Sequence, residues 1–420
     1  MNALAHVVIV GAGQAGARCA HALREFGYDG AVSLVGDEPD APYERPPLSK
    51  AMLGAHAGAT RVHLYEAARY DDARIDLLLG TRALRLRADE HAIDLDDGRT
   101  LRYDRCILAT GGRARPWPGR IRGDGARLLT LRSLAHARVL RERLQQARSL
   151  IVIGGGFLGL ECADAARAQG IDVTVIESRH SLLPDKLPAA LSAQLLKRHE
   201  ARGIRFRFGG QIKQIVDEPG KPLRVSLRDG ETCDADLCLI AIGQLPNVEL
   251  AAQAGLVTDT GIAVDRLCRT SAPHVYAAGD CVSFPFGETG RRVRVESWQN
   301  AEQQSRAAAA NALGIETPYT LLPWFWTDQA DWNMQFLGLE DPLAPDMRWI
   351  VRDGSTQNSA RAVWIGLRDA RPVAAVALNS GGDVTPLRKL LASGAPVEEA
   401  ALADTGQRLG KLVQELISRT

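Results

Sequence analysis

The chain has 420 residues, of which 45% are hydrophobic and 24% are charged, and its net charge is +1 at pH 7. This length predicts about two to four domains with a sizeable core, and the nearly neutral charge argues against a general binder of nucleic acid. No apolar stretch approaches the ~20 residues that span a bilayer, and the N-terminus lacks a signal-peptide pattern. We therefore expect a globular, cytoplasmic protein that binds neither nucleic acid nor membrane.

The first predicted element is an apolar strand that runs directly into a glycine-rich turn, over residues 7–16. The pattern G-x-G-x-x-G is typical of a strand, a tight turn and a helix N-terminus, where free backbone N–H groups hold a pyrophosphate. A second β-rich run, residues 32–35, leads to Asp37. A Rossmann unit places there the carboxylate that binds an adenosine ribose.

The same pattern recurs over residues 150–159, and its β-rich partner, residues 173–176, ends at Glu177. Each turn is followed by a predicted helix of similar length that stops at a glycine. Ordinary glycine-rich turns with chance acids are the alternative, and the repetition argues against it. Two copies predict two bound dinucleotides, and hence a protein that moves electrons between a flavin and a nicotinamide.

Each of these units continues into β-rich sequence, residues 75–108 and 204–240. The first stretch closes on Ala-Thr-Gly and the second on Ile-Gly, segments that bring backbone close to a cofactor. A later strand ends in Gly279-Asp280. Glycine permits close approach and aspartate accepts hydrogen bonds from hydroxyls, so Asp280 is suited to a ribityl chain.

Cys233 and Cys238 have the spacing of the redox disulfide of flavin disulfide reductases. Their segment reads as one strand, however, on which residues five apart face opposite sides. We therefore predict two small buried side chains. The seven cysteines and nine histidines show no metal-ligand spacing, so reduced thiols and no metal site are expected.

The last hundred residues are predicted to form a third unit. Trp324 and Trp326 share one face if their segment is a strand, with Phe325 on the other face. A hydrophobic interface strand is the simplest interpretation. Helical spacing of apolar residues follows at 387–392 and 409–417.

Four runs are the most specific marks of the chain: residues 44–50 (ERPPLSK), 109–113 (ATGGR), 154–161 (GGGFLGLE) and 323–329 (PWFWTDQ). With them the whole chain resembles the FAD-dependent, NADH-using ferredoxin reductases that serve bacterial aromatic-ring dioxygenases and haem monooxygenases. The lysine-containing and tryptophan-rich runs separate this family from the wider glutathione-reductase-like class.

The resemblance implies an α/β fold with two Rossmann-like, glutathione-reductase-like dinucleotide-binding domains and a C-terminal α+β domain. The FAD-binding domain would comprise residues 1–110 and 241–318. Residues 111–240 would form the NAD-binding domain, and 319–420 the C-terminal interface domain.

The resemblance also assigns residues to FAD. Lys50 would lie beside flavin N5, and Asp37 would bind the adenine-side ribose. The residues expected to contact FAD are Gly11, Gly13, Ala15, Gly16, Asp37, Arg45, Lys50, Ala83, Ala109, Thr110, Gly111, Arg132, Gly279, Asp280 and Trp298.

The second turn is expected to bind NADH. Glu161 would face the nicotinamide carboxamide. The Glu177 carboxylate would favour NADH over NADPH by repelling the 2′-phosphate, by about 1–3 kcal/mol; Arg179, two residues on, is a possible acceptor of that phosphate. The residues expected to contact NAD are Gly154, Gly156, Gly159, Glu161, Glu177 and Gly243.

No catalytic residue or metal is expected, because hydride uptake and single-electron release belong to the flavin; Lys50 and Glu161 would flank the reacting rings. The partner implied is a [2Fe–2S] ferredoxin. Its docking surface is expected to include Arg291, Arg292, Arg294, Trp324 and Trp326. A solvated basic loop is an equally good interpretation of the arginines.

Three alternatives remain open from the sequence. An NADH-dependent peroxide or disulfide reductase would need a reactive cysteine near the flavin. A rubredoxin reductase would differ only in its acceptor. A non-enzymatic flavoprotein similar to apoptosis-inducing factor would show no turnover with a ferredoxin.

Overall fold

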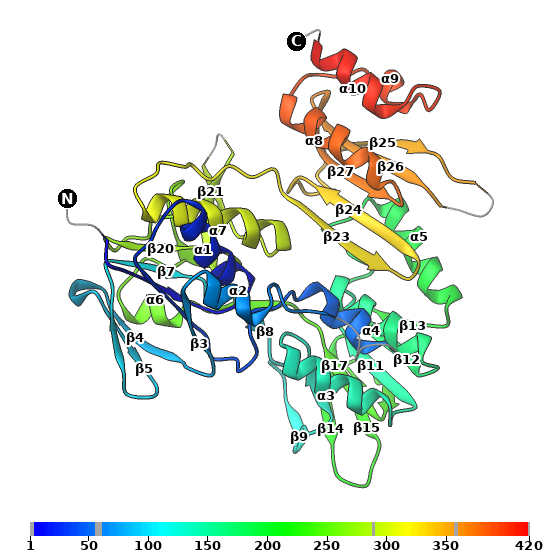
Figure 1. Ribbon diagram of the computed structural model, residues 1–420. Coiled ribbons are helices and arrows are strands. Elements are labelled where there is room, and N and C mark those ends of the chain that lie inside the picture. The colour runs from blue at the N-terminus through cyan, green and yellow to red at the C-terminus, as the bar shows by residue number, and fades with distance from the viewer. Residues whose placement is uncertain (1–3, 55–60, 288–289, 357–359, 419–420) are drawn as a thin grey trace. The chain divides into compact units, whose positions relative to one another are not determined.

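The computed structural model describes residues 4–54, 61–287, 290–356 and 360–418 (Figure 1). They group into two compact units. The first unit contains residues 1–47, 61–113 and 244–321, and the second contains 48–60, 114–243 and 322–420.

The first unit is built on a parallel sheet with strand order β20-β7-β1-β2-β3. The central strand β1 is buried on both faces, since Val7, Val8 and Ile9 are fully inaccessible to solvent. This explains why the sequence shows a continuous apolar run there rather than an alternation. The strands are β1 (His6–Val10), β2 (Ala31–Val35), β3 (Ile75–Leu78), β7 (Arg105–Leu108) and β20 (Val275–Ala277).

Helix α1 (Gln14–Glu25) leaves the first glycine turn and packs against α7 (Trp298–Ala312), as Figure 1 shows. The alanines of α7 are buried. Ser297 caps α7, because its side chain accepts a hydrogen bond from the backbone N–H of Asn300. The unit's short helices are α2 (Ala67–Asp72) and α6 (Glu249–Gln253).

Other segments of the chain form smaller sheets. The order β4-β5-β6 is antiparallel, β19-β21-β22 is mixed, and β18 pairs with β8. Their bounds are β4 (Ala83–Arg87), β5 (Ala92–Leu95), β6 (Thr100–Arg102), β8 (Gly112–Ala114), β18 (Gln244–Pro246), β19 (Ile262–Ala263), β21 (Val282–Phe286) and β22 (Arg291–Val293).

The second unit repeats the design with a parallel sheet of order β10-β17-β11-β12-β13. Strand β11 takes the central place of β1, and it too leads through a glycine turn into a 12-residue helix. The elements are β10 (Leu128–Thr130), β11 (Ser149–Ile153), β12 (Asp172–Glu177), β13 (Arg205–Phe208), β17 (Leu237–Ile240), α3 (Leu134–Leu144), α4 (Phe157–Ala168) and α5 (Ala189–Ala201).

The prediction of a single strand through Cys233 and Cys238 is wrong. Cys233 lies in β16 (Thr232–Ala235), an outer strand of the sheet β16-β15-β14-β9, whereas Cys238 lies in β17 of the parallel sheet. Asp236 separates them, because its carboxylate accepts hydrogen bonds from the backbone N–H groups of Arg148 and Ser149. The other strands of that sheet are β9 (Ile121–Gly123), β14 (Ile212–Asp217) and β15 (Leu223–Leu227).

The second unit ends in an antiparallel sheet of order β23-β24-β27-β26-β25. One face packs on the C-terminal helices through Ile365 and Leu387, and the other face packs on α4 and α5 through Trp364 and Phe336. The elements are β23 (Trp324–Gln329), β24 (Trp332–Leu337), β25 (Arg348–Asp353), β26 (Ala362–Arg368), β27 (Arg371–Leu378), α8 (Val384–Ser393), α9 (Glu399–Ala403) and α10 (Leu409–Ser418).

The predicted fold class is confirmed: two Rossmann-like sheets and a C-terminal α+β portion are present. The predicted division into three domains stays a prediction. The chain groups into two compact units, and of the predicted third domain residues 319–321 group with the first unit and 322–420 with the second. Among the helices in the described part of the chain, none is both long and apolar enough to cross a bilayer.

Candidate functional site

The first glycine turn is shaped by three glycines with different surroundings. Gly11 has φ +113°, and a Cβ there would collide with the carbonyl oxygen of Ala109. A Cβ on Gly16 would collide with the carbonyl oxygen of Gly11. A Cβ on Gly13 would meet only the guanidinium of Arg45, at 4.0 Å. The outer glycines therefore close the turn, while the middle one leaves space beside the backbone.

The second turn has the same three environments. Gly154 has φ +107°, and a Cβ there would press on the carbonyl oxygen of Ala241. Gly159 lies against the carbonyl oxygen of Gly154, and a Cβ on Gly156 would meet no heavy atom within 4 Å. The backbone N–H of Gly154 bonds to Ile176, as that of Gly11 bonds to Val35. The repeat seen in the sequence is thus a repeat of geometry.

The helices that follow both turns begin without a side-chain cap. Gly13 and Gly156 are the N-cap residues of α1 and α4, and neither can accept a hydrogen bond through a side chain. Helices α3 and α7, by contrast, are capped by Ser133 and Ser297. Uncapped N–H groups beside open space favour a phosphate group. The residues at both turns therefore fit the pyrophosphates of FAD and NAD.

Glu177 lies at the second turn, where the sequence predicts the ribose-binding acid. Its side chain is mostly buried, and its carboxylate accepts hydrogen bonds from the backbone N–H groups of Gly155, at 2.7 Å, and Arg179, at 2.9 Å. Arg179 also forms an ion pair with Asp185. The carboxylate is consequently held at the edge of the turn before any ligand arrives.

At the first turn the predicted acid, Asp37, is exposed, and its neighbour Glu38 is the engaged carboxylate. Glu38 pairs with Arg45 at 2.9 Å and accepts a hydrogen bond from the Tyr43 hydroxyl. Burial lowers the pKa of Arg45, but Tyr43 and Glu38 outweigh it, so the pKa lies above its ordinary value. A fixed cation beside Gly13 suits a phosphate.

The segments ending in Thr110 and Asp280 lie side by side, because β7 pairs with β20. The Thr110 hydroxyl donates to the backbone carbonyl of Asn247, and the Asn247 amide donates back to the Thr110 carbonyl. Gln304, fully buried on α7, accepts from the N–H of Gly279 at 2.9 Å. The sequence alone did not point to Asn247 or Gln304, because neither belongs to a motif. Each forms its hydrogen bond with backbone that lies far away in the sequence.

Other residues predicted to contact FAD are placed as follows. Trp298 opens α7, and its indole N–H donates to Glu44 at 3.1 Å. Ala83 begins β4, and Arg132 follows β10 in the second unit. Ala15 is buried in the first turn of α1, and Gly111 and Gly243 both have positive φ. These assignments remain predictions.

Lys50 lies in a cluster of the second unit that joins three distant segments. Its ammonium donates to Asp328 at 2.7 Å and lies 3.5 Å from Glu161. The two Glu161 oxygens accept from the hydroxyls of Ser49 and Thr327, each at 2.5 Å. Burial raises the pKa of Asp328, but the hydrogen bonds from Lys50 and a neighbouring asparagine outweigh it and bring it below its usual value. The cluster fixes the two residues expected to flank the rings.

The tryptophan-rich run forms strand β23, as predicted. Trp324 and Trp326 stack with their centroids 5.2 Å apart, while Phe325 stacks on Phe336 on the opposite face. The guanidinium of Arg388 lies 4.8 Å from the centre of the Trp324 ring. Trp324 is therefore part of the packing of the C-terminal sheet.

The predicted basic cluster is partly neutralised by acids of the first unit. Arg292 pairs with Asp259 at 2.8 Å, and Arg294 pairs with Glu296. Arg291 is exposed at the start of β22.

In the described ranges, no group of three or more His, Cys, Asp or Glu side chains is arranged to hold a metal ion.

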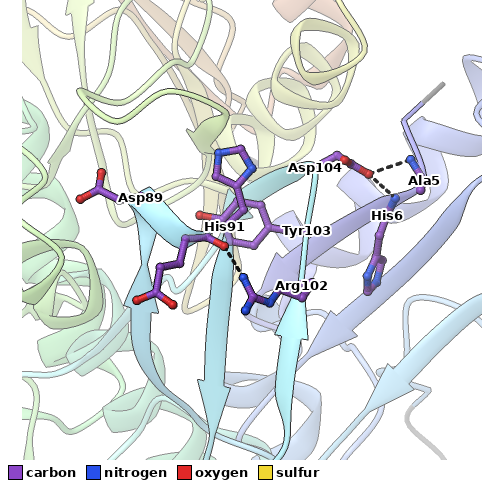
Figure 2. Close-up of a pocket in the computed structure, with 8 residues that line it drawn as sticks. Ala5, His6, Asp89, His91, Arg102, Tyr103 and Asp104 are labelled. Carbon is purple, nitrogen blue, oxygen red and sulfur yellow. Dashed lines mark hydrogen bonds between the residues drawn. The ribbon is translucent and has the colours of Figure 1, made fainter. Parts of the chain in front are cut away.

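A pocket of about 510 Å³ lies elsewhere on the first unit, near the start of β1 (Figure 2). Its Asp104 accepts from the backbone N–H groups of Ala5 and His6, and its His91 stacks on Tyr103. None of the residues predicted to bind a cofactor lines it. Its polar contacts hold the N-terminal strand in place.

Two protein families match the chain. Residues 5–305 match the family described as pyridine nucleotide-disulphide oxidoreductase, and residues 324–413 match the one described as reductase C-terminal. The first match contains both glycine turns, and the second contains the tryptophan strand.

Relatives are similar over nearly their whole length. The anthranilate 1,2-dioxygenase system ferredoxin–NAD(+) reductase component of Burkholderia cepacia is 42% identical, covering 94% of this chain and 96% of the relative. The ferredoxin reductase for the CYP199A2 system of Rhodopseudomonas palustris is 35% identical, with a TM-score of 0.90 over 97% of this chain and 99% of that one.

A third similar structure is that of the covalent putidaredoxin reductase–putidaredoxin complex, which is 34% identical, with a TM-score of 0.90 over 99% of each chain. These matches agree with the paired turns and with the C-terminal sheet. The chain therefore belongs to the pyridine nucleotide-disulphide oxidoreductase family and, within it, to the FAD-dependent ferredoxin–NAD(+) reductases.

Proposed function

We propose that this reductase passes electrons from NADH through FAD, one at a time, to a [2Fe–2S] ferredoxin that feeds a bacterial oxygenase. The observation that carries the proposal is the pair of open glycine turns, each at an uncapped helix N-terminus. When bound, FAD supplies the conversion between a two-electron donor and a one-electron acceptor. The chain itself would bind the two cofactors, orient them and exclude water from them.

The residues of the two turns would hold the two pyrophosphates, with Gly13 and Gly156 at closest approach. Glu177 supports NADH as the donor, because its fixed carboxylate can accept from ribose hydroxyls but repels a 2′-phosphate. The Lys50, Glu161 and Asp328 side chains restrain one another. We propose that this cluster keeps Lys50 and Glu161 at the reacting rings.

A ferredoxin partner agrees with the relatives, two of which are named as ferredoxin reductases. For docking we propose the surface predicted from the sequence, with the exposed Arg291 at the start of β22 and Trp326 on β23 as the members to test. Arg292 and Arg294 of this surface form ion pairs with Asp259 and Glu296, and Trp324 packs under Arg388. An exposed cation steers an acidic partner and makes the association rate depend on salt.

A peroxide or disulfide reductase is disfavoured by the cysteines. Six of the seven are buried, and Cys233 is half-buried. Burial raises the pKa of all seven thiols. A reactive cysteine needs the opposite shift, because the thiolate is the nucleophile. Thiols that stay reduced are also the basis for proposing a cytoplasmic location.

The test is NADH-driven reduction of cytochrome c by the FAD-loaded enzyme, with and without a [2Fe–2S] ferredoxin from a dioxygenase system. We expect strong dependence on the ferredoxin, and a much lower rate with NADPH. A rubredoxin in place of the ferredoxin tests the alternative acceptor. Rapid flavin reduction by NADH without turnover on any acceptor would favour the non-enzymatic flavoprotein instead.

A further inference from the structure

The loop that follows strand β12 is fixed by the protein on both sides. The backbone carbonyl of Arg179 accepts a hydrogen bond from Gly209 at 2.9 Å, and the Ser192 hydroxyl donates to the carbonyl of Leu182 at 2.6 Å. Leu182 and Leu187 are fully buried. The loop therefore presents its charged side chains from a defined backbone.

Arg179 is held on this loop by two acids. Its guanidinium forms an ion pair with Asp185, and its Nε lies 3.7 Å from Glu177. About half of the Arg179 side chain and two thirds of the Asp185 side chain are exposed, at 51% and 66%. Asp185 is the direct partner, because it accepts a hydrogen bond from the Arg179 guanidinium, whereas the Glu177 oxygen at 3.7 Å is beyond hydrogen-bond distance.

We propose that Asp185 is a specificity-determining residue that acts through Arg179 to exclude the 2′-phosphate of NADPH. The proposal rests on the proposed function, because it concerns the coenzyme held at the second turn. An arginine two residues past the ribose-binding acid is well suited to a phosphate. Asp185 pairs with that guanidinium and adds a negative charge next to the one on Glu177.

The expected effect is modest because the pair is exposed. Ion pairs at such positions are weak and are screened by salt. Releasing Arg179 should therefore tighten NADP⁺ binding by roughly two- to five-fold. The effect should be largest at low ionic strength.

The experiment measures NAD⁺ and NADP⁺ binding to the oxidised, FAD-loaded enzyme by titration calorimetry. The variants are Asp185→Asn, the double variant Arg179→Ala/Asp185→Asn, and the control Asp234→Asn. The control breaks another exposed arginine–aspartate pair of the same unit, with Arg224 at 2.7 Å. We expect tighter NADP⁺ binding in Asp185→Asn only, with NAD⁺ binding unchanged within two-fold.

Unchanged NADP⁺ affinity in Asp185→Asn would overturn the proposal, as would a gain that persists in the double variant or appears in the control. These results leave the proposed function intact as long as the wild type binds NAD⁺. Failure of the wild type to bind NAD⁺ would overturn the proposed function and this proposal together.

Discussion

At the scale of single residues, the glycines of each turn are of two kinds: two are required by the fold, and one faces open space. The first and last glycines of each turn are required by the backbone, since a Cβ would collide with a carbonyl group of the same unit. The middle glycine faces space, so under the proposed function its missing side chain would matter to the ligand rather than to the fold. This division makes the function of the turn testable by the smallest possible substitution.

Gly156→Ala should leave the protein folded and loaded with FAD but weaken NAD⁺ binding by at least about ten-fold. Its φ of −76° and ψ of 174° suit alanine, and the added methyl group would occupy the space for the pyrophosphate. Calorimetric titration with NAD⁺ and a thermal melt check both parts.

The matched control is Gly159→Ala, in which the methyl group collides with the carbonyl oxygen of Gly154. That variant should lower the melting temperature, whereas Gly156→Ala should not. Wild-type affinity for NAD⁺ in Gly156→Ala would show that the second turn does not bind the coenzyme.

Glu177→Gln should reduce the preference for NADH over NADPH by roughly 5- to 150-fold in kcat/KM, because it removes the charge that repels the 2′-phosphate. It should also cost about 1–3 kcal/mol of stability. One amide oxygen cannot accept from both Gly155 and Arg179 as the carboxylate does. Steady-state kinetics with both coenzymes and a denaturant titration measure these effects. An unchanged coenzyme preference would mean that Glu177 does not select the coenzyme.

At the scale of elements, packing against helix α1 buries a titratable side chain among aromatic rings. His21, on α1, packs on Tyr65 and Tyr70 with ring centroids 4.2 Å and 5.2 Å apart. Its Nε2 atom is buried and has no hydrogen-bond partner among the described residues. Burial, together with Arg69 and Arg18, lowers the pKa of His21 to about 4.

The lowered pKa of His21 predicts an acid-sensitive contribution to stability. As the pH falls below about 6.5, His21 becomes protonated in the unfolded chain but stays neutral in the folded protein, where its pKa is lower. The contribution is therefore complete above pH 6.5 and is lost as the pH falls toward 4. His21→Phe keeps an aromatic ring and should show a smaller drop in melting temperature between pH 6.5 and pH 4.5. An equal drop in both proteins would assign the acid sensitivity to other groups.

Strand β23 offers a second test at this scale. Trp326→Ala should lower the rate of ferredoxin reduction while leaving NADH-dependent reduction of ferricyanide, a small acceptor, nearly unchanged. Trp324→Ala should instead lower the melting temperature, because that ring packs under Arg388 and its indole N–H donates to Gln335 at 3.0 Å. If Trp326→Ala slows both acceptors equally, the side chain does not serve the partner.

The sequence predicted those features that are local in the chain. The turns, the shared face of Trp324 and Trp326, and the position of Glu177 all follow from short motifs and from strand alternation. The cluster around Lys50 could not be predicted as contacts, because Glu161 and Asp328 come from segments far along the chain. The strand break at Asp236 was missed for the same reason, since its partners Arg148 and Ser149 lie at the start of β11, far back in the chain.

At the scale of the whole molecule, the chain repeats one architecture and then departs from it. Strand orders β20-β7-β1-β2-β3 and β10-β17-β11-β12-β13 place the glycine turn after the central strand in both units. Among the described residues of the first unit, no five-stranded antiparallel sheet corresponds to the one that follows the second parallel sheet. Two glycine turns on parallel sheets, followed by an antiparallel C-terminal sheet, agree with the proposed donor, flavin and protein acceptor.

The most direct test of this account is the electron stoichiometry of an anaerobic reaction. The FAD-loaded enzyme, in catalytic amount, is mixed with a limiting quantity of NADH and an excess of oxidised [2Fe–2S] ferredoxin. The account predicts that two ferredoxins are reduced for each NADH consumed, since each accepts one electron. Consumption of NADH without reduction of ferredoxin would contradict the account.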